Sequence, residues 1–348
     1  MKYARFILSR SKVLEQYKAV KVLADEVSYS FKTNPEVGKV LEKETDSCFS
    51  LHSIENLDLI KDKKRIWLFG QAWDKAELGS IFSKGIRKFV VDNENDLEIL
   101  LDFIENKDVK IDVLLRMKIK ENTIHTGKYF VFGMSSDKIN ELIPKLKQNK
   151  NIAQLGIHIH RKSQNISEWS LKYELEQVLS DETLTAIDLL NIGGGLPWKY
   201  KNFKADVIEH ISSKIVEVKK WLNKNNIRVI IEPGRFIAAP SVKIEAEIIN
   251  IYDNNIIINC SVYNTSMDTF VANIRLLVEG ELKEEKFRSG NAKAYIIKGC
   301  TPCSMDLFRY RVFLKNPKVG DKIVFLNAGA YNFATDFCGL MKLDTVTL

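Results

Sequence analysis

Short apolar runs recur along the first two thirds of this sequence, and segments with helical spacing separate them. Eight runs of about five to seven residues are partly β-branched or aromatic and end in turn signals, so we expect eight strands: residues 27–31, 47–51, 65–70, 88–92, 112–117, 154–159, 187–193 and 228–234. Helical spacing between them is clearest at 93–106, where Leu97, Leu100, Leu101 and Ile104 share a face. Strands that alternate with helices predict a parallel sheet, and eight strands suffice to close a (β/α)₈ barrel.

An open, doubly wound sheet is the structural alternative. Such a sheet usually carries a glycine-rich phosphate turn after its first strand, whereas Lys32 follows the first strand here. Beyond residue 240 the runs are strand-like with few helical intervals, so we expect a second, β-rich domain. The predicted domains are residues 1–240, the barrel with its lead-in, and residues 241–348, with the boundary at the segment that contains Pro240.

Composition and charge exclude several classes of protein. The net charge is +7, but the lysines lie mostly on predicted helical faces, which favours a solvated surface over a nucleic-acid site. We find no apolar run of the roughly 18 residues that a membrane helix needs. The first residues lack the apolar core of a signal peptide, so a cytoplasmic location is expected.

The cysteines point to free thiols. There are five, an odd number, and without a secretory signal they predict no disulfide framework. Cys300 and Cys303 form a single Cys-x-x-Cys pair with no further ligands at matching spacing, so we predict no metal site.

Polar residues follow the ends of most predicted strands, and in a βα-barrel these ends meet at one rim. Lys32 follows the first strand, His52 the second, Asp92 ends the fourth and Arg116 lies in the fifth. The last three strands lead into His160, into Gly193, Gly194 and Gly195, and into Glu232, Gly234 and Arg235. Each of these residues alone has an ordinary structural explanation, such as a flexible turn, a surface acid or a packed histidine. Together at one rim they indicate a site.

Pyridoxal phosphate is a cofactor whose binding and chemistry need this set of groups. A lysine binds its aldehyde, a glycine turn and an arginine hold its phosphate, a flat ring stacks on it, and a buried acid pairs with its ring nitrogen. Glu232 follows four apolar residues, so its carboxylate should be partly buried and need a cationic partner. In His-Ile-His at 158–160, we expect one ring to point into the barrel and the other away.

The sequence resembles the fold-type III pyridoxal-phosphate decarboxylases, with an alanine-racemase-like barrel, which include ornithine, diaminopimelate, arginine and carboxynorspermidine decarboxylases. The resemblance lies in YSFKTNP, GIHIHRKSQ, NIGGGLP, EPGRFIAAPS and GAYNFATDFCG, in that order over nearly the whole chain. It implies that Lys32 binds the aldehyde and His160 stacks on the ring. It also implies that phosphate contacts come from Ser163, from Gly193 to Gly195 and from Tyr331, that Glu232 meets the ring nitrogen, and that Gly234 and Arg235 serve cofactor binding and fold.

The chain departs from the family pattern in three places. In GCTPCSMD, residues 299–306, proline falls on the family's cysteine, so Cys303 is the expected proton-donating thiol only if the loop shifts by one residue. Asp306 lies where a substrate-contacting aspartate belongs. Arg275 is a candidate contact for a distal carboxylate. Arg161 and Lys162 replace small residues before Ser163.

The resemblance implies an amino-acid decarboxylase in which Lys32, His160 and Cys303 are catalytic. The first candidate substrate is a basic diamino acid (ornithine, lysine or arginine) for polyamine synthesis, and the alternative carries a distal carboxylate, as diaminopimelate and carboxynorspermidine do. A homodimer with shared active sites is expected. The rivals are a racemase, which Glu232 disfavours, a non-catalytic cofactor-binding protein, and a barrel hydrolase that uses Asp92 and His52.

Overall fold

The chain forms two compact units in a computed structural model that describes residues 4–119, 132–203, 206–283, 292–332 and 334–348. The barrel unit comprises Tyr17–Pro197 and Asp206–Gly234, and the β-rich unit comprises Met1–Gln16, Trp198–Ala205 and Arg235–Leu348. The β-rich unit thus begins at residue 235 rather than at the predicted 241. It also takes in the start of the chain, which the sequence analysis assigned to the barrel.

The barrel unit contains the predicted closed barrel of eight parallel strands. Pairing of Glu26 with Ile230 joins the first and last strands and closes the ring. The strands are β2 (Glu26–Ser30), β3 (Cys48–Leu51), β4 (Ile66–Gly70), β5 (Lys88–Val91), β6 (Ile111–Arg116), β7 (Ile152–His158), β8 (Leu189–Asn191) and β9 (Arg228–Ile231).

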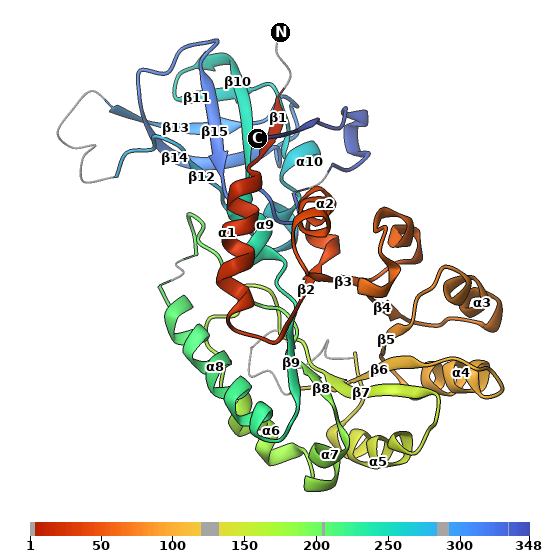
Figure 1. Ribbon diagram of the computed structural model, residues 1–348. Coiled ribbons are helices and arrows are strands. Elements are labelled where there is room, and N and C mark those ends of the chain that lie inside the picture. Colours follow the sequence, from red (N-terminus) through yellow and green to blue (C-terminus); the bar gives the residue numbers. More distant parts are fainter. Residues whose placement is uncertain (1–3, 120–131, 204–205, 284–291, 333) are drawn as a thin grey trace. The chain divides into compact units, whose positions relative to one another are not determined.

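Helices follow the strands and lie on the outside of the barrel (Figure 1). They are α2 (Pro35–Glu44), α3 (Lys75–Ser83), α4 (Glu94–Ile104), α5 (Ser136–Lys147), α6 (Leu171–Val178), α7 (Asp181–Ala186) and α8 (Ile208–Lys224), while α1 (Arg10–Lys21) precedes the barrel and η2 (Ile54–Leu59) and η3 (Lys63–Arg65) lie between β3 and β4. Their amphipathic faces pack on the strands, as the 3.6-residue spacing predicts.

The turn after β2 is built from local sequence signals. Asn34 caps α2, because its side chain accepts hydrogen bonds from the backbone N–H groups of Glu36 and Val37, and Pro35 occupies the first helical turn. The cap leaves only the single turn η1 (Phe31–Thr33) between β2 and α2. Lys32 is therefore held on a short, well-defined connection.

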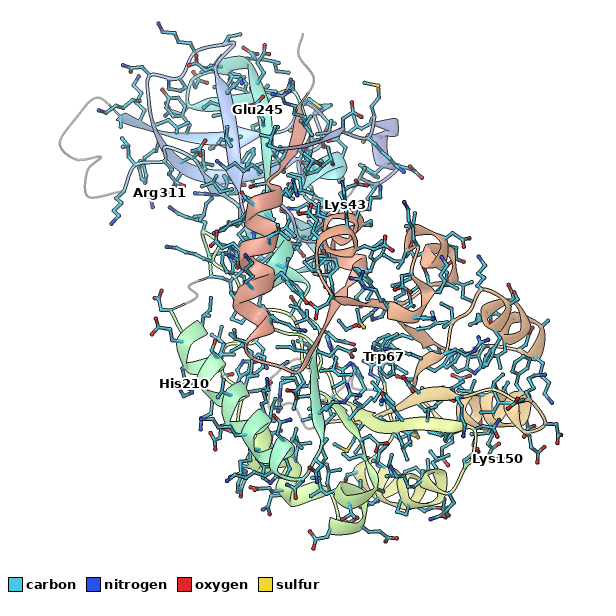
Figure 2. All side chains as sticks on the ribbon, in the orientation of Figure 1. Lys43, Trp67, Lys150, His210, Glu245 and Arg311 are labelled. Atoms are coloured by element: carbon cyan, nitrogen blue, oxygen red, sulfur yellow. The ribbon has the colours of Figure 1, made fainter. Side chains whose placement is uncertain are left out.

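Large side chains fill the interior of the barrel. Trp67 of β4 is fully buried among the strands (Figure 2). It belongs to a buried cluster drawn from six strands: Cys48, Trp67, Val90, Leu114, Leu189 and Ile230. A packed interior leaves the carboxyl ends of the strands as the place for a site.

The β-rich unit is an eight-stranded mixed sheet with the order β12-β15-β10-β11-β13-β14; β1 also pairs with β10, and β16 pairs with β1. Its strands are β1 (Arg5–Leu8), β10 (Val242–Tyr252), β11 (Asn255–Ile258), β12 (Leu277–Val278), β13 (Ala292–Lys298), β14 (Leu307–Lys315), β15 (Lys322–Leu326) and β16 (Thr345–Thr347). Its helices are α9 (Arg235–Ser241), α10 (Val262–Thr265), α11 (Asp268–Val271) and η4 (Phe337–Gly339). Within the described residues, no helix is long and apolar enough to cross a membrane.

Candidate active site

A cavity of about 340 Å³ opens at the carboxyl ends of the barrel strands. Three predicted site residues line it, namely Lys32, His160 and Glu232. The other lining residues are His52, Phe69, Gly70, Gln71, Val90, Asp92, Arg116, Phe132 and His158. The barrel thus brings together side chains that are up to 200 positions apart in the sequence.

Lys32 reaches this cavity from η1. The Lys32 side chain is accessible to solvent, yet protein atoms surround most of it. The resulting loss of hydration is the main cause that lowers the pKa of its amine. The Glu232 carboxylate opposes the shift and the Arg116 guanidinium adds to it. A lysine with a lowered pKa has more neutral amine at neutral pH, which is the form that attacks an aldehyde.

Glu232 is the centre of a buried polar network at the end of β9. Its Oε1 accepts hydrogen bonds from Ser50 Oγ at 2.7 Å and Asn191 Nδ2 at 2.9 Å, and its Oε2 lies 3.3 Å from His158 Nε2. Burial alone would raise the pKa of Glu232, but the charge and hydrogen bond of His158 and the Ser50 hydrogen bond outweigh it and hold the pKa well below its ordinary value. The network therefore keeps a buried carboxylate ionised.

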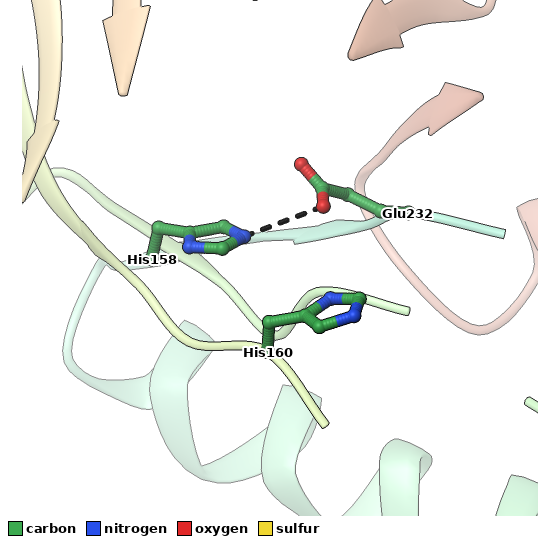
Figure 3. A group of neighbouring side chains, drawn as sticks. All are labelled: His158, His160 and Glu232. Atoms are coloured by element: carbon green, nitrogen blue, oxygen red, sulfur yellow. Dashed lines mark hydrogen bonds and ion pairs between the residues drawn. The ribbon is translucent and has the colours of Figure 1, made fainter. Parts of the chain in front are cut away.

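His158 and His160 both face this network, as Figure 3 shows. Their rings are nearly parallel, at an interplanar angle of 12° with centroids 6.3 Å apart. The expectation that one ring points away from the site was wrong, because residues two apart on a strand share a face and the intervening Ile159 is the one that turns away. The ligand atoms of His158, His160 and Glu232 lie within 4.8 Å of one another, close enough for one metal ion to bridge them.

His160 is held as a neutral ring. Its Nδ1 accepts the Gly194 N–H at 3.3 Å, which places its own proton on Nε2. Burial is the main cause that lowers the pKa of His160 to about 3, so the ring carries no charge at neutral pH. A neutral flat ring at the cavity wall is suited to stacking on an aromatic ligand.

The glycine turn lies against the segment that follows β7. Gly193 and Gly195 adopt left-handed φ values of 67° and 101°. A side chain on Gly193 would meet Ile159 O at 2.2 Å, and one on Gly195 would meet Lys162 O at 2.9 Å. Ser163 belongs to the same segment, two residues before Asn165, whose N–H donates to Gly195 O. Backbone N–H groups can approach an anion closely at such a turn.

We expect Gly193→Ala to destabilise the protein and weaken cofactor binding. The new Cβ would collide with backbone at a left-handed φ, and such strain costs about 1–3 kcal/mol. Gly85→Ala is the matched control, since Gly85 has a similar φ of 86° but its new Cβ would lie 3.9 Å from the nearest neighbour, Lys63 Cβ. Thermal unfolding and cofactor titration of both variants measure the difference, and equal effects would contradict a cradle role for the turn.

The cavity also contains His52, Asp92 and Arg116, for which the sequence predicted a place at the rim but no role toward the cofactor. Arg116 Nη1 donates to Asp92 Oδ1 at 2.9 Å. His52 stacks on Phe69 with centroids 4.5 Å apart, and burial, together with the Lys32 charge, lowers the pKa of His52 to about 3. His52, Asp92 and Arg116 stood at predicted strand ends, which was the available signal. Ser50 and Asn191, which donate hydrogen bonds to Glu232, lie inside the predicted strands, so the sequence gave no signal for their role.

Gly234 and Arg235 fall in different units. Gly234 packs in the barrel unit, where a Cβ would meet Thr33 Oγ1 at 2.2 Å, so it supports the turn that carries Lys32. Arg235 is buried in the β-rich unit, donates to Asp268 Oδ2 at 2.5 Å and to the Tyr200 hydroxyl at 3.0 Å, and lies over the Tyr331 ring at 5.2 Å. The structure gives Arg235 these protein partners, and its phosphate contact and that of Tyr331 stay predictions.

Cys303, Asp306 and Arg275 all belong to the β-rich unit. The buried Asp306 carboxylate accepts hydrogen bonds from the N–H groups of Val262 and Thr301 and from Thr301 Oγ1, so it organises the cysteine loop. Cys303 lines a cavity of about 620 Å³ beside this loop. Substrate contacts by Asp306 and Arg275 stay predictions.

Cys303 differs from its neighbour Cys300 in its electrostatics. The Tyr263 hydroxyl lies 3.0 Å from the Cys303 thiol, and this hydrogen bond is the main cause that lowers the pKa of Cys303. The same contact raises the pKa of Tyr263 to about 12. Burial instead raises the pKa of Cys300. Cys303 is thus the more acidic of the two thiols.

We expect Tyr263→Phe to raise the pKa of Cys303 toward its ordinary value, because the variant loses the donor that stabilises the thiolate. Alkylation of Cys303, followed by peptide mass spectrometry across a pH series, measures this pKa. The pH midpoint of alkylation should move upward in the variant. Tyr310→Phe, at a tyrosine that borders the same cavity, is the control and should leave the midpoint unchanged.

The fold and site define a class of protein. A closed parallel barrel presents a lysine amine, a neutral histidine ring and an ionised buried carboxylate around one cavity, and the glycine turn adjoins the histidine through the Gly194 N–H. The family model for pyridoxal-dependent decarboxylases, pyridoxal binding domain, matches residues 10–239, which is more than half of the chain. The chain belongs to this family, and pyridoxal phosphate is its cofactor.

Individual relatives agree with the family. Diaminopimelate decarboxylase of Halalkalibacterium halodurans is 27% identical over 191 residues, which cover 49% of this chain and 44% of that protein. Ornithine decarboxylase of Candida albicans is 26% identical over 300 residues, which cover 74% of this chain and 62% of that protein. The first alignment spans less than half of that relative's length, and the second spans less than two thirds of the other's. The lysine/ornithine decarboxylase of Vibrio vulnificus has the same fold, with a TM-score of 0.79 at 22% identity over 99% of this chain and 94% of that one.

The residues of the barrel unit fit pyridoxal phosphate. The glycine turn is a cradle that a Cβ would fill, and it adjoins the His160 ring through the Gly194 N–H. Lys32 supplies an amine with a lowered pKa in the same cavity as the ionised Glu232. A bridging metal at His158, His160 and Glu232 would account for neither the glycine turn nor Lys32.

Proposed function

We propose that this protein catalyses the pyridoxal-phosphate-dependent decarboxylation of an amino acid. The observation that carries the proposal is the presence of the Lys32 amine and the buried, ionised Glu232 carboxylate in one cavity. Pyridoxal phosphate, when bound, supplies an aldehyde for covalent attachment and an electron sink for the bond to the leaving carboxylate.

Three residues of the barrel cavity, the glycine turn and Cys303 each have a proposed task. Lys32 holds the cofactor covalently and accepts or returns a proton at its amine during substrate exchange. His160 orients the ring by stacking, and the turn at 193–195 binds the phosphate through backbone N–H groups. Glu232 keeps a proton on the ring nitrogen, because its carboxylate is ionised and fixed by three side chains. Cys303 is the proposed donor of the proton that replaces the carboxylate, and its lowered pKa relative to Cys300 supports that choice.

The first candidate substrate is a basic diamino acid such as ornithine, lysine or arginine. The ornithine decarboxylase of Candida albicans aligns over 74% of this chain, which supports this choice. The second candidate is a substrate with a distal carboxylate, and the diaminopimelate decarboxylase relative supports it. A homodimer is part of the proposal.

Release of CO₂ from a panel of substrates tests the activity and chooses between the candidates. The panel consists of ornithine, lysine, arginine, diaminopimelate and carboxynorspermidine, each at the same concentration with the cofactor-loaded protein. Turnover of one of the first three supports the first candidate, and turnover of one of the last two supports the second. Racemisation of a substrate without CO₂ release would contradict the proposal, and sensitivity to dialysis against EDTA would favour a metal at the histidine pair.

A further inference from the structure

A cavity lined by cations lies in the β-rich unit. It measures about 290 Å³, and its lining consists of four basic and two aromatic side chains: Lys201, Arg275, Arg309, Tyr310, Arg311 and Phe313. Tyr310 also borders the larger cavity beside Cys303. Of this lining, only Arg275 has a predicted role in the proposed decarboxylation, as a contact for a distal carboxylate. We name the smaller cavity the cationic cavity.

A β-bulge in β14 brings three consecutive residues to the cationic cavity. Ile297 pairs with Arg309 and Tyr295 pairs with Val312, so two residues of β14, Tyr310 and Arg311, oppose a single residue of β13. Arg311 has a φ of 49°, in the left-handed region that residues other than glycine seldom adopt. Side chains of a regular strand alternate between its faces, whereas three consecutive residues border the cationic cavity here. The two arginines would share a face of a regular strand, and the bulge adds Tyr310 to them at the cavity.

Within the described residues, two of these cations share one carboxylate and a third has an unsatisfied donor. Glu281 Oε1 accepts hydrogen bonds from Lys201 Nζ at 2.8 Å and from Arg309 Nη2 at 2.9 Å, so two cations share one carboxylate. Arg309 is almost fully buried and also donates to Leu276 O at 2.6 Å. Arg275 Nη1 is buried and has no hydrogen-bond partner within the described part of the chain. A buried guanidinium donor without an acceptor is costly, and this one belongs to a side chain that lines the cationic cavity.

We propose that the cationic cavity binds a small oxyanion with the charge and shape of a phosphate group. Guanidinium groups present several N–H donors in a planar fork that matches phosphate oxygens, and these hydrogen bonds are strengthened by charge. The volume of about 290 Å³ suits inorganic phosphate or a small phosphate monoester. Both of these ligands present a phosphate group. Titration with each of them distinguishes inorganic phosphate from a phosphate monoester.

Isothermal titration of the full-length, pyridoxal-phosphate-loaded protein with inorganic phosphate tests the proposal, with sodium chloride holding the ionic strength constant. The bound cofactor fills the glycine turn with its own phosphate, which leaves the cationic cavity as the expected site. We expect saturable binding of one phosphate per chain. Arg275→Gln should weaken it by at least about tenfold, the effect of losing a charged hydrogen bond. Lys293→Gln, which removes the same charge from an exposed position on β13, should change it less than about twofold.

A second variant keeps the test independent of the folding of the first. Arg311→Gly removes a cation but suits the left-handed backbone, so it should fold at least as stably as the wild type and still bind phosphate more weakly. Glycerol phosphate, titrated in parallel, distinguishes the sources, and tighter binding than inorganic phosphate would indicate a phosphorylated metabolite. Absence of saturable binding in the wild type, or equal weakening in Lys293→Gln, would overturn the proposal. So would wild-type affinity in both arginine variants.

Discussion

Lys32→Ala should abolish covalent attachment of the cofactor and reduce kcat for CO₂ release by a factor on the order of 10² to 10⁴, the contribution typical of a positioned proton-transfer group. Lys32 is the lysine that reaches the barrel cavity from η1, and its lowered pKa makes the neutral amine available there. Borohydride treatment followed by mass spectrometry of the digested protein measures the attachment. The modified peptide should contain Lys32 in the wild type and be absent from the variant.

Lys43→Ala is the control for this change, because Lys43 is an exposed lysine on α2 of the same unit. It should keep both the modification of Lys32 and the rate of CO₂ release. Borohydride labelling of a different lysine in the wild-type protein would refute the role of Lys32, and with it the reading of the cavity as a cofactor site.

Glu232→Gln should reduce kcat by a factor on the order of 10² to 10³, the cost of losing one preorganised electrostatic contact in a buried site. The glutamine can still accept the Ser50 hydrogen bond, so the network should keep much of its geometry while losing its negative charge. Single-turnover measurement of CO₂ release separates this effect from slow product release. The affinity for the cofactor should fall by a smaller factor than kcat does.

Glu98→Gln provides the matched comparison, since Glu98 is an exposed acid on α4 of the barrel unit. The comparison variant should retain full activity. If Glu232→Gln also retains it, the ionised carboxylate is not needed for CO₂ release and a different reaction must be sought for this cavity.

The sequence was informative where a chemical group coincides with a strand end. Eight apolar runs predicted the barrel, and the residues after those runs predicted Lys32, His160, the glycine turn and Glu232 as neighbours, which share or adjoin one cavity in the structure. His158 was misjudged although the signal was present, because the two-residue period of a strand puts residues 158 and 160 on one face.

Other features depend on contacts that local sequence does not encode. Ser50 reaches Glu232 across 182 positions of the chain, and its neighbours in sequence form an ordinary buried strand. The first strand, β1, pairs with β10 some 240 positions away, with Arg5 opposite Glu245, so the start of the chain belongs to the β-rich unit rather than to the predicted lead-in of the barrel. The bulge at Tyr310 and Arg311 likewise depends on the partner strand β13.

Asn191 joins the two halves of the proposed cofactor site with a single amide. Its Nδ2 donates to Glu232 and its Oδ1 accepts the Gly193 N–H at 2.8 Å. Binding of the cofactor's ring nitrogen and binding of its phosphate should therefore be energetically coupled. Cofactor analogues altered at both ends should then show non-additive losses of affinity, and Asn191→Ala should restore additivity.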